Sequence, residues 1–200
     1  MEVYASEVVA IVGRSGSGKT SLLSILAGLH LPTSGTVELL GQNLNALDED
    51  QRAAIRLGRV AFVFQSFELL PELTALENVM LPLQITGEPN PEREARQWLN
   101  KVGLHERIRH FPTQLSGGEQ QRVAIARAFV TNPQIVFADE PTGNLDETTA
   151  KAITDLMFDL NEKYGTTMVF VTHDQALAQR CHRTFSMRSG TLQTDETLPS

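Results

Sequence analysis

The sequence predicts an α/β fold with a mostly parallel sheet and an inserted helical segment. Short runs of β-branched and apolar residues alternate with stretches of helical pattern, and these runs are apolar throughout rather than at every second residue. Strands of this kind are buried on both faces, which is typical of a parallel sheet covered by helices. Between about Phe67 and Val130 no convincing strand is visible, and this predicts the helical insertion.

Five segments have the pattern of strands: Val8–Val12, Thr36–Leu40, Val60–Phe64, Ile135–Ala138 and Met168–Thr172. Helices are predicted from capping residues and apolar spacing. They are Lys19–Leu29, a helix from Asp48 to Leu57, a helix started by the capping-box spacing of Thr74 and Glu77, a helix from Pro91 to Val102, Glu119–Val130, and a helix from Asp146 to about Lys163.

These elements indicate one domain in three parts. Residues 1–66 and about 131–193 form the α/β core, about 67–130 form a helical subdomain, and 194–200 form a polar tail. A chain of 200 residues is long enough to bury a sizeable core of its own.

Composition excludes several classes of protein. The formal net charge of -7 argues against binding nucleic acid by bulk charge. The single cysteine, Cys181, cannot form an internal disulfide. No apolar run approaches the roughly 20 residues of a membrane helix, so we expect a soluble chain that would reach a membrane only by docking onto another protein.

A phosphate-binding loop follows the first predicted strand. The segment matches G-x-x-x-x-G-K-[ST] in full: Gly13-Arg14-Ser15-Gly16-Ser17-Gly18-Lys19-Thr20. Its glycines let backbone N–H groups point at phosphate oxygens, and the helix that follows adds its dipole there. We expect Lys19 to reach the β- and γ-phosphates and Thr20 to bind Mg²⁺. This motif predicts the core of a P-loop nucleotide hydrolase.

Three polar residues follow two later strands. Asp139 and Glu140 end the strand from Ile135, and His173 follows Met168–Thr172. Because strands of an open parallel sheet deliver their C-terminal residues to the ligand crevice, all three should face the phosphates. We expect Asp139 to hold Mg²⁺ from its second coordination shell or through water, Glu140 to orient or deprotonate the attacking water, and His173 to contact the γ-phosphate.

A second anion-binding motif lies in the helical segment. Leu115-Ser116-Gly117-Gly118-Glu119-Gln120-Gln121-Arg122 resembles the signature of ABC (ATP-binding cassette) ATPases, and it precedes a helix whose N-terminus would expose N–H groups. The order of phosphate loop, Gln65, signature, Asp139-Glu140, Asn144-Leu145-Asp146 and His173 resembles the same family over nearly the whole chain.

The resemblance implies an ATP hydrolase that uses ATP and Mg²⁺. It implies a head-to-tail homodimer in which Ser116, Gly117 and Gly118 close on the ATP of the partner, with Asp146 at the dimer contact. It also implies that Gln65 touches Mg²⁺ and water. The apolar residues after Gln65 are equally well explained as core or as the place that receives a helix of a membrane permease: Phe67, Leu69, Leu70, Leu73 and Leu76.

Two longer segments narrow the resemblance. Phe64 to Val79 and Ala138 to Asp146 resemble the subgroup that serves lipoprotein release and macrolide export. The implied protein is a subunit on the cytoplasmic face of the cell membrane that powers a permease by ATP-driven dimer closure and does not bind nucleic acid.

The N-terminal region departs from the family pattern. Family members usually have about 30 residues before the first strand, including an aromatic residue that stacks on adenine, an interaction of roughly 1 kcal/mol. Tyr4 lies too close to the phosphate loop to match that position, so we do not assign it to adenine. We expect a fragment of a normal ATPase rather than a degenerate protein that binds ATP but hydrolyses it poorly.

Two alternative functions are weaker. A GTPase would share the phosphate loop, but Asn161-Glu162-Lys163-Tyr164 lacks the aspartate of a guanine-reading motif. An ABC ATPase of DNA repair or chromosome maintenance would carry long coiled coils before the signature, and no sustained heptads separate Lys19 from Ser116.

Overall fold

A six-stranded sheet forms the centre of the computed structural model, which describes residues 1–195. All neighbouring strands are parallel except the last two, which form an antiparallel pair. In spatial order the strands are β4 (Val60–Phe64), β5 (Ile135–Asp139), β6 (Thr167–Thr172), β1 (Val8–Gly13), β7 (Arg183–Arg188) and β8 (Thr191–Asp195). The predicted α/β fold with a mostly parallel sheet is therefore confirmed.

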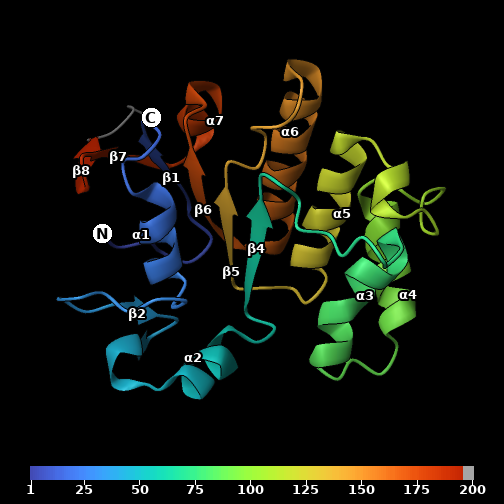
Figure 1. The fold of residues 1–200 in the computed structure, drawn as a ribbon, viewed down its shortest axis with the longest axis horizontal. Helices are drawn as coiled ribbons and strands as arrows, with labels where there is room; N and C mark the ends of the chain where they lie inside the picture. The colour runs from blue at the N-terminus through green and yellow to red at the C-terminus, as the bar shows by residue number, and fades with distance from the viewer. Residues whose placement is uncertain (196–200) are drawn as a thin grey trace.

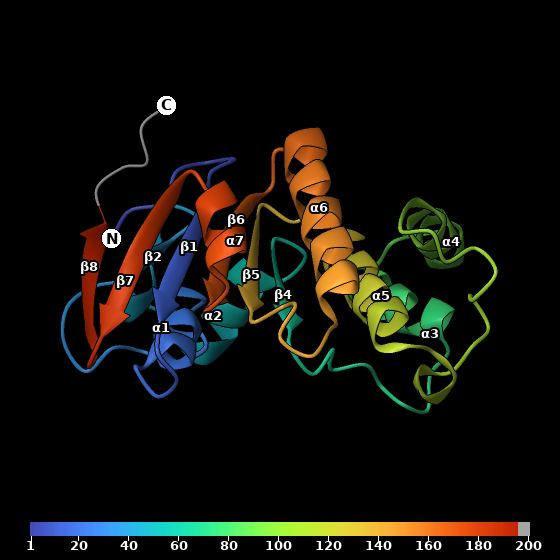
Figure 2. The ribbon, with the colours of Figure 1, turned by 90° about the horizontal axis from the view of Figure 1, so that it is seen from above.

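Helices cover both faces of this sheet (Figures 1 and 2). The α-helices are α1 (Lys19–Leu26), α2 (Glu49–Arg56), α3 (Ala75–Ile85), α4 (Pro91–Lys101), α5 (Gly117–Phe129), α6 (Glu147–Tyr164) and α7 (Gln175–Arg180). Two short 3-10 turns, Leu44–Ala46 and Pro112–Gln114, and a two-stranded sheet of β2 (Glu38–Leu39) and β3 (Gln42–Asn43) complete the elements.

The central strands are apolar along their middle because each face of the sheet has its own core. On β1, Val8 and Ala10 belong to the buried cluster that includes residues of α5, α6 and α7, whereas Val9 and Ile11 belong to the one that includes α1 and Leu39 of the small sheet. Successive side chains of a strand point to opposite faces, so a strand covered on both sides is apolar at successive positions. The continuous apolar runs in the sequence therefore reflect the packing of other elements against both faces of the sheet.

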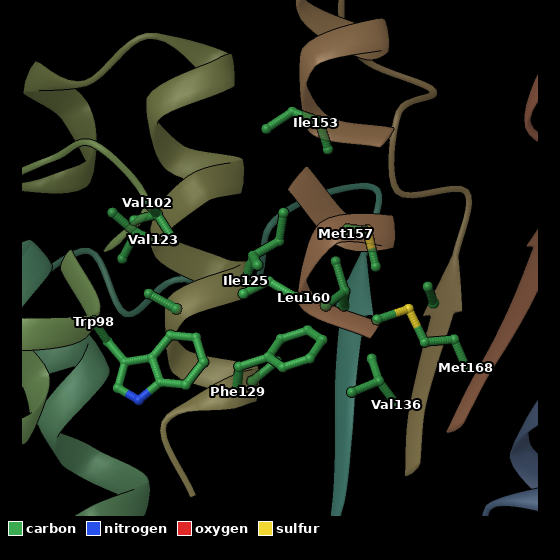
Figure 3. Close-up of a cluster of buried hydrophobic side chains, with 14 of the residues drawn as sticks. Trp98, Val102, Val123, Ile125, Phe129, Val136, Ile153, Met157, Leu160 and Met168 are labelled. Carbon is green, nitrogen blue, oxygen red and sulfur yellow. The ribbon is translucent and has the colours of Figure 1, made fainter. Parts of the chain in front are cut away.

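The helices α3, α4 and α5 gather beside the edge strand β4, at one end of the molecule (Figure 1). Their core is continuous with that of the sheet. Phe129 of α5 lies 6.0 Å from the ring of Trp98 on α4 and packs in the same cluster as Val136 of β5 and Met168 of β6 (Figure 3). The helix α5 thus connects the helical region to the sheet.

Local capping explains where several helices begin. Asp48 and Gln51 form a capping box at α2, and Thr74 and Glu77 form one at α3. Asp146 caps α6 by accepting a hydrogen bond from the Thr149 N–H at 3.0 Å. These starts were predicted correctly, because a cap is specified by residues only three positions apart.

Two predicted boundaries and the end of the chain need correction. Helix α1 ends at Leu26 rather than Leu29, because Gly28 adopts a left-handed φ of 70°. The strand predicted over Thr36–Leu40 pairs only at Glu38–Leu39, since Leu40 and Gly41 are left-handed and turn the chain into β3.

The elements after His173 were not predicted: α7, β7 and β8. Strand β8 continues to Asp195, two residues into the expected polar tail, and the remainder of that tail, residues 196–200, lies outside the described residues. No helix within residues 1–195 is long and apolar enough to cross a membrane.

Candidate functional site

A cleft of about 940 Å³ lies at the C-terminal ends of β1, β4, β5 and β6. Ten of the predicted site residues line it together with Ser21, Phe64 and Ser66; the ten are Arg14, Ser15, Gly16, Gly18, Lys19, Thr20, Gln65, Asp139, Glu140 and His173. In a parallel α/β sheet this edge is where ligands bind. The topology therefore brings together residues that are up to 159 positions apart in the sequence.

The loop between β1 and α1 needs glycine for two reasons, lack of space at one position and backbone conformation at two others. A Cβ on Gly13 would lie 2.5 Å from the carbonyl oxygen of Met187 on β7, so only glycine fits between the two strands' ends. Gly16 and Gly18 have φ values of 76° and 98°, a conformation that glycine adopts without strain. The backbone at this turn therefore requires the glycines that the motif supplies.

Lys19 lies at the start of α1, and only 8% of the residue is exposed. Its Nζ donates hydrogen bonds to the carbonyl oxygens of Gly13 at 2.8 Å and Arg14 at 3.2 Å. The ammonium group is therefore held inside the curve of the loop, next to the N-terminus of the helix. Positive charge and a helix N-terminus together favour an anion such as phosphate.

Thr20 and Asp139 meet at the floor of the cleft. The Thr20 hydroxyl donates a hydrogen bond to Asp139 Oδ2 at 2.9 Å. Burial raises the pKa of Asp139 above its ordinary value, and the negative charge of Glu140 adds to this, although Thr20 and Lys19 oppose the shift. A cation beside this carboxylate would favour its charged form.

Glu140 follows Asp139 in a left-handed conformation, with a φ of 47°. Its N–H donates to the carbonyl oxygen of Val171 at 2.8 Å, which holds this loop against the end of β6. Its Oε2 accepts hydrogen bonds from the buried Thr172 hydroxyl at 3.3 Å and from the His173 N–H at 3.3 Å. The His173 Nδ1 lies 2.9 Å from the same oxygen, so the carboxylate is fixed by the residues that end β6.

Gln65 follows β4 and is linked to the loop after Glu140. Its Nε2 donates to Asn144 Oδ1 at 2.9 Å, and Asn144 Nδ2 donates back to the Gln65 carbonyl at 3.0 Å. A Cβ on Gly143 would lie 2.8 Å from Gln65 Nε2. The two loops therefore fit closely against each other through this glycine.

The signature residues start α5, which begins at Gly117 rather than at the predicted Glu119, because both glycines belong to its first turn. Ser116 caps the helix, and Ser116 and Glu119 form a capping box. Hydrogen bonds from the Ser116 N–H, the Arg107 side chain and the Ser116 hydroxyl outweigh burial and lower the pKa of Glu119. Ser116 is exposed at this helix end, where an anion can approach it.

Gly118 lies against the first turn of α6. A Cβ at this position would lie 2.5 Å from Thr149 Cγ2. The signature therefore contacts, within the same chain, the helix that Asp146 caps. This close contact fixes the position of the N-terminus of α5 relative to that of α6.

We expect Gly118→Ala to lower the free energy of unfolding by about 1–3 kcal/mol, because the added methyl group overlaps Thr149. Adding Thr149→Ser, which removes only the clashing methyl group, should restore most of the loss. Urea unfolding of the single and double variants measures both changes. A single variant as stable as the parent, or a double variant no better than the single, would contradict this packing.

Six predicted site residues do not line the cleft. Gly13 and Ser17 line a second pocket on the β7 side of the same phosphate loop. The other four lie away from the loop: Ser116, Gly117, Gly118 and Asp146. Within the chain, the signature and the phosphate loop thus lie at the N-termini of two separate helices, α5 and α1. This separation agrees with the resemblance to ABC ATPases, which implies that the signature closes on the ATP of a partner chain.

The cleft residues fit a nucleotide with Mg²⁺. The loop, whose turn uses the left-handed conformations of Gly16 and Gly18, and the buried Lys19 suit phosphate oxygens. Residues 1–195 contain no group of three or more His, Cys, Asp and Glu side chains that could hold a metal ion by itself. Thr20 and Asp139 supply two oxygen atoms, and Mg²⁺ characteristically completes such a pair with phosphate oxygens and water.

Thr172 was missed as a site residue. Its hydroxyl contacts Glu140 and also accepts a hydrogen bond from the Asp174 N–H at 3.0 Å. A polar residue at the last position of an otherwise apolar strand was the available signal. Asn144, named only as part of a motif, proved to be the partner of Gln65.

Comparison with known proteins agrees with this geometry. The sequence profile of the ABC transporter family matches residues 1–143. The chain belongs to the ABC transporter family. This ABC protein is 53% identical over 195 residues to an uncharacterized ABC transporter ATP-binding protein, YbbA, of Escherichia coli (strain K12), with 96% of this chain and 86% of YbbA covered.

Two further matches refine the placement. The ABC chain is 52% identical over 191 residues to the lipoprotein-releasing system ATP-binding protein LolD of Hydrogenovibrio crunogenus, covering 94% of this chain and 83% of LolD. Its fold matches the dimeric ATP-binding cassette MJ0796 bound to ADP and Pi, with a TM-score of 0.88, 40% identity and coverage of 99% and 89% of the two chains. The chain is therefore an ABC ATPase, an ATP-binding and ATP-hydrolysing subunit of this family.

Proposed function

We propose that this ABC ATPase powers a membrane permease by closing as a head-to-tail homodimer on two ATP molecules. The single observation that carries the proposal is the separation of its two anion-binding ends. The cleft holds Lys19 and the phosphate loop, whereas the helix end at Ser116 lies outside it. A second copy is the simplest source of a helix end for each cleft.

Within one chain, the phosphate loop binds the nucleotide. Its backbone N–H groups and Lys19 hold phosphate oxygens, while Thr20, Asp139 and Gln65 hold Mg²⁺. When bound, Mg²⁺ neutralises charge on the phosphate oxygens. The pairing of Thr20 with Asp139 supports this assignment, because both oxygens already converge on one point beside the loop.

Glu140 orients and deprotonates the water that attacks the γ-phosphate. Thr172 and the His173 backbone hold one carboxylate oxygen of Glu140, which fixes the direction of the group. His173 contacts Glu140 through Nδ1 and has a largely exposed side chain, 72% of whose surface is accessible. Its other ring nitrogen therefore remains available for the γ-phosphate.

The partner chain completes each site. Ser116, Gly117 and Gly118 of one copy bind the γ-phosphate held by the other, and Asp146 lies at the contact between the copies. The dimeric MJ0796 cassette bound to ADP and Pi supports this arrangement, since its chain superposes on nearly all of this one.

A groove of about 480 Å³ is the proposed docking place for the permease on the cytoplasmic face of the membrane. Its apolar lining includes Leu57, Phe62 and Ile85, and Glu68 lies at its side. Leu57 and Ile85 are 51% and 62% exposed. Exposed apolar side chains in a groove beside the Gln65 loop suit a short apolar segment of a membrane protein.

Some of the apolar residues after Gln65 belong to the core, and others are free to receive a helix of a permease. Leu69 and Leu76 pack against the core, whereas Leu70 is 42% exposed. Relatives named for lipoprotein release support a permease partner of the exporter type.

Chemical cross-linking tests the head-to-tail dimer. Chains carrying Arg14→Cys and chains carrying Thr113→Cys, both with Glu140→Gln, are mixed with Mg-ATP and a short thiol-to-thiol cross-linker. Burial raises the pKa of the native Cys181 to about 12, so this thiol stays protonated and unreactive at pH 8. We expect an ATP-dependent covalent dimer, seen on a denaturing gel.

The matched control replaces Thr113→Cys with Arg93→Cys, on the outer surface of α4, where the side chain is 73% exposed. This mixture should not form the dimer. Absence of an ATP-dependent dimer from the first mixture, or equal yields from both mixtures, would show that Ser116 does not close on a partner's phosphate loop.

A further inference from the structure

Helix α5 carries two polar side chains that hydrogen-bond to loops beside the cleft: Gln121 is buried in the interior, and Arg127 is half-buried at the wall of the groove described above. Gln121 is fully buried, and its Nε2 donates a hydrogen bond to the carbonyl oxygen of Pro141 at 2.6 Å. Because a carbonyl can only accept, the amide nitrogen must face it. Pro141 directly follows Glu140, so α5 contacts the loop of the proposed base.

Arg127 lies on another side of the same helix. Its Nη2 donates to the carbonyl oxygen of Phe67 at 2.9 Å, and its Nη1 donates to the carbonyl oxygen of Glu68. These carbonyls follow Gln65 by two and three residues. One helix therefore bonds the backbones of both loops that carry the proposed base and the proposed Mg²⁺ ligand.

Both loops contain strained backbone at the place where α5 holds them. Glu140 has a φ of 47°, and Phe67 and Glu68 have φ values of 63° and 49°. Residues other than glycine persist in this region only when surrounding structure fixes them, and such strain is concentrated at functional sites. The hydrogen bonds from Gln121 and Arg127 are part of that fixing structure.

Stability alone does not explain the amide of Gln121. Its Oε1 is buried and has no hydrogen-bond partner among residues 1–195. An unpaired buried acceptor is costly, and an apolar side chain of the same length would avoid that cost. What the amide supplies is a directed hydrogen bond to Pro141.

We propose that Gln121 and Arg127 are positioning residues, through which the helix that begins at Ser116 fixes the Glu140 and Gln65 loops. Contact of Ser116 with a partner's nucleotide would then change the position of the catalytic groups of the same chain, because α5 connects them as one rigid element. This inference rests on the proposed roles of Glu140 and Gln65.

The first test is Gln121→Met, which keeps the length of the side chain and removes the donor and the unpaired acceptor. We expect kcat for ATP hydrolysis to fall by about 10- to 100-fold, since small misplacements of reacting groups have effects of this size. The KM for ATP should change less than about threefold, and the Tm should stay within about 2 °C of the parent or rise. Adding Gln121→Met to a Glu140→Gln chain should leave ATP-dependent dimerisation intact.

Thr154→Val is the matched control, because it also removes a buried polar group from a helix, α6, and no hydrogen bond joins Thr154 to either loop among those found in residues 1–195. Its kcat should match the parent. Parental kcat in Gln121→Met, or a loss of kcat in proportion to lost folding and dimerisation, would overturn the inference. Normal hydrolysis by Glu140→Gln alone would instead overturn the proposed base.

The second test compares Arg127→Met with Arg127→Lys. In Arg127→Met we expect kcat to fall about tenfold and the Mg²⁺ concentration for half-maximal activity to rise several-fold, because the Gln65 loop loses its support. Lysine can donate to either carbonyl, so Arg127→Lys should recover part of both effects. Identical behaviour of the two variants, or a Mg²⁺ requirement unchanged in both, would overturn the role of Arg127.

Discussion

Replacing Glu140 with glutamine is expected to lower kcat for ATP hydrolysis by about 1,000-fold, because the amide cannot accept a proton from the attacking water. Glutamine has the same shape as glutamate, so the loop held by Val171 and Thr172 should keep its place. ATP should still bind, and the closed dimer should accumulate because the γ-phosphate is not removed. Steady-state phosphate release and gel filtration with Mg-ATP measure the two effects.

Glu147→Gln provides the matched control for this change. Glu147 is an exposed acid in the first turn of α6, seven residues from Glu140, and the same substitution there should leave kcat unchanged. If Glu140→Gln hydrolyses ATP within about threefold of the parent, the general base is another group. If it loses hydrolysis but remains monomeric with Mg-ATP, the dimer that closes on ATP is wrong.

Phe129→Ala is expected to lower the free energy of unfolding by about 3–5 kcal/mol. Phe129 is 1% exposed and fills the space between Trp98 and the sheet residues around Val136 (Figure 3). The cavity left by alanine would separate α5 from both the helical region and the sheet. Urea unfolding followed by circular dichroism measures the loss.

Phe111→Ala makes the same chemical change at a position that is 41% exposed. Its loss should be less than about 1 kcal/mol, as for most surface substitutions. Equal losses in the two variants would mean that α5 does not share one core with the sheet.

The local features of the site could be predicted from the sequence. The phosphate loop needs glycines and a lysine at fixed spacing, and the capping box of Ser116 and Glu119 joins residues three positions apart. The strand that ends in Asp139 and Glu140 was visible as an apolar run followed by two carboxylates. Each of these features depends on short-range geometry, which the order of residues specifies directly.

The roles of Gln121 and Arg127 could not be predicted from the sequence. Both are polar residues in a helix that also exposes polar positions, so nothing in the spacing distinguishes them from surface residues. Their roles depend on Pro141 and Phe67, which are 20 and 60 positions away. The strands β7 and β8 were missed for a similar reason, because their short mixed sequences acquire strand structure by pairing with β1 and with each other.

By itself, the sequence determined the doubly covered parallel sheet, the phosphate loop, the carboxylates at a strand end and the helix cap at Ser116, since all of these follow from periodicity, conformational preference and close spacing. Only the tertiary structure decided that His173 contacts Glu140 and that Gln65 pairs with Asn144. It also decided that α5 hydrogen-bonds to the loop after Glu140 and to the loop after Gln65. The physical reason is that these contacts join segments brought together by sheet order and core packing, which depend on the whole chain at once.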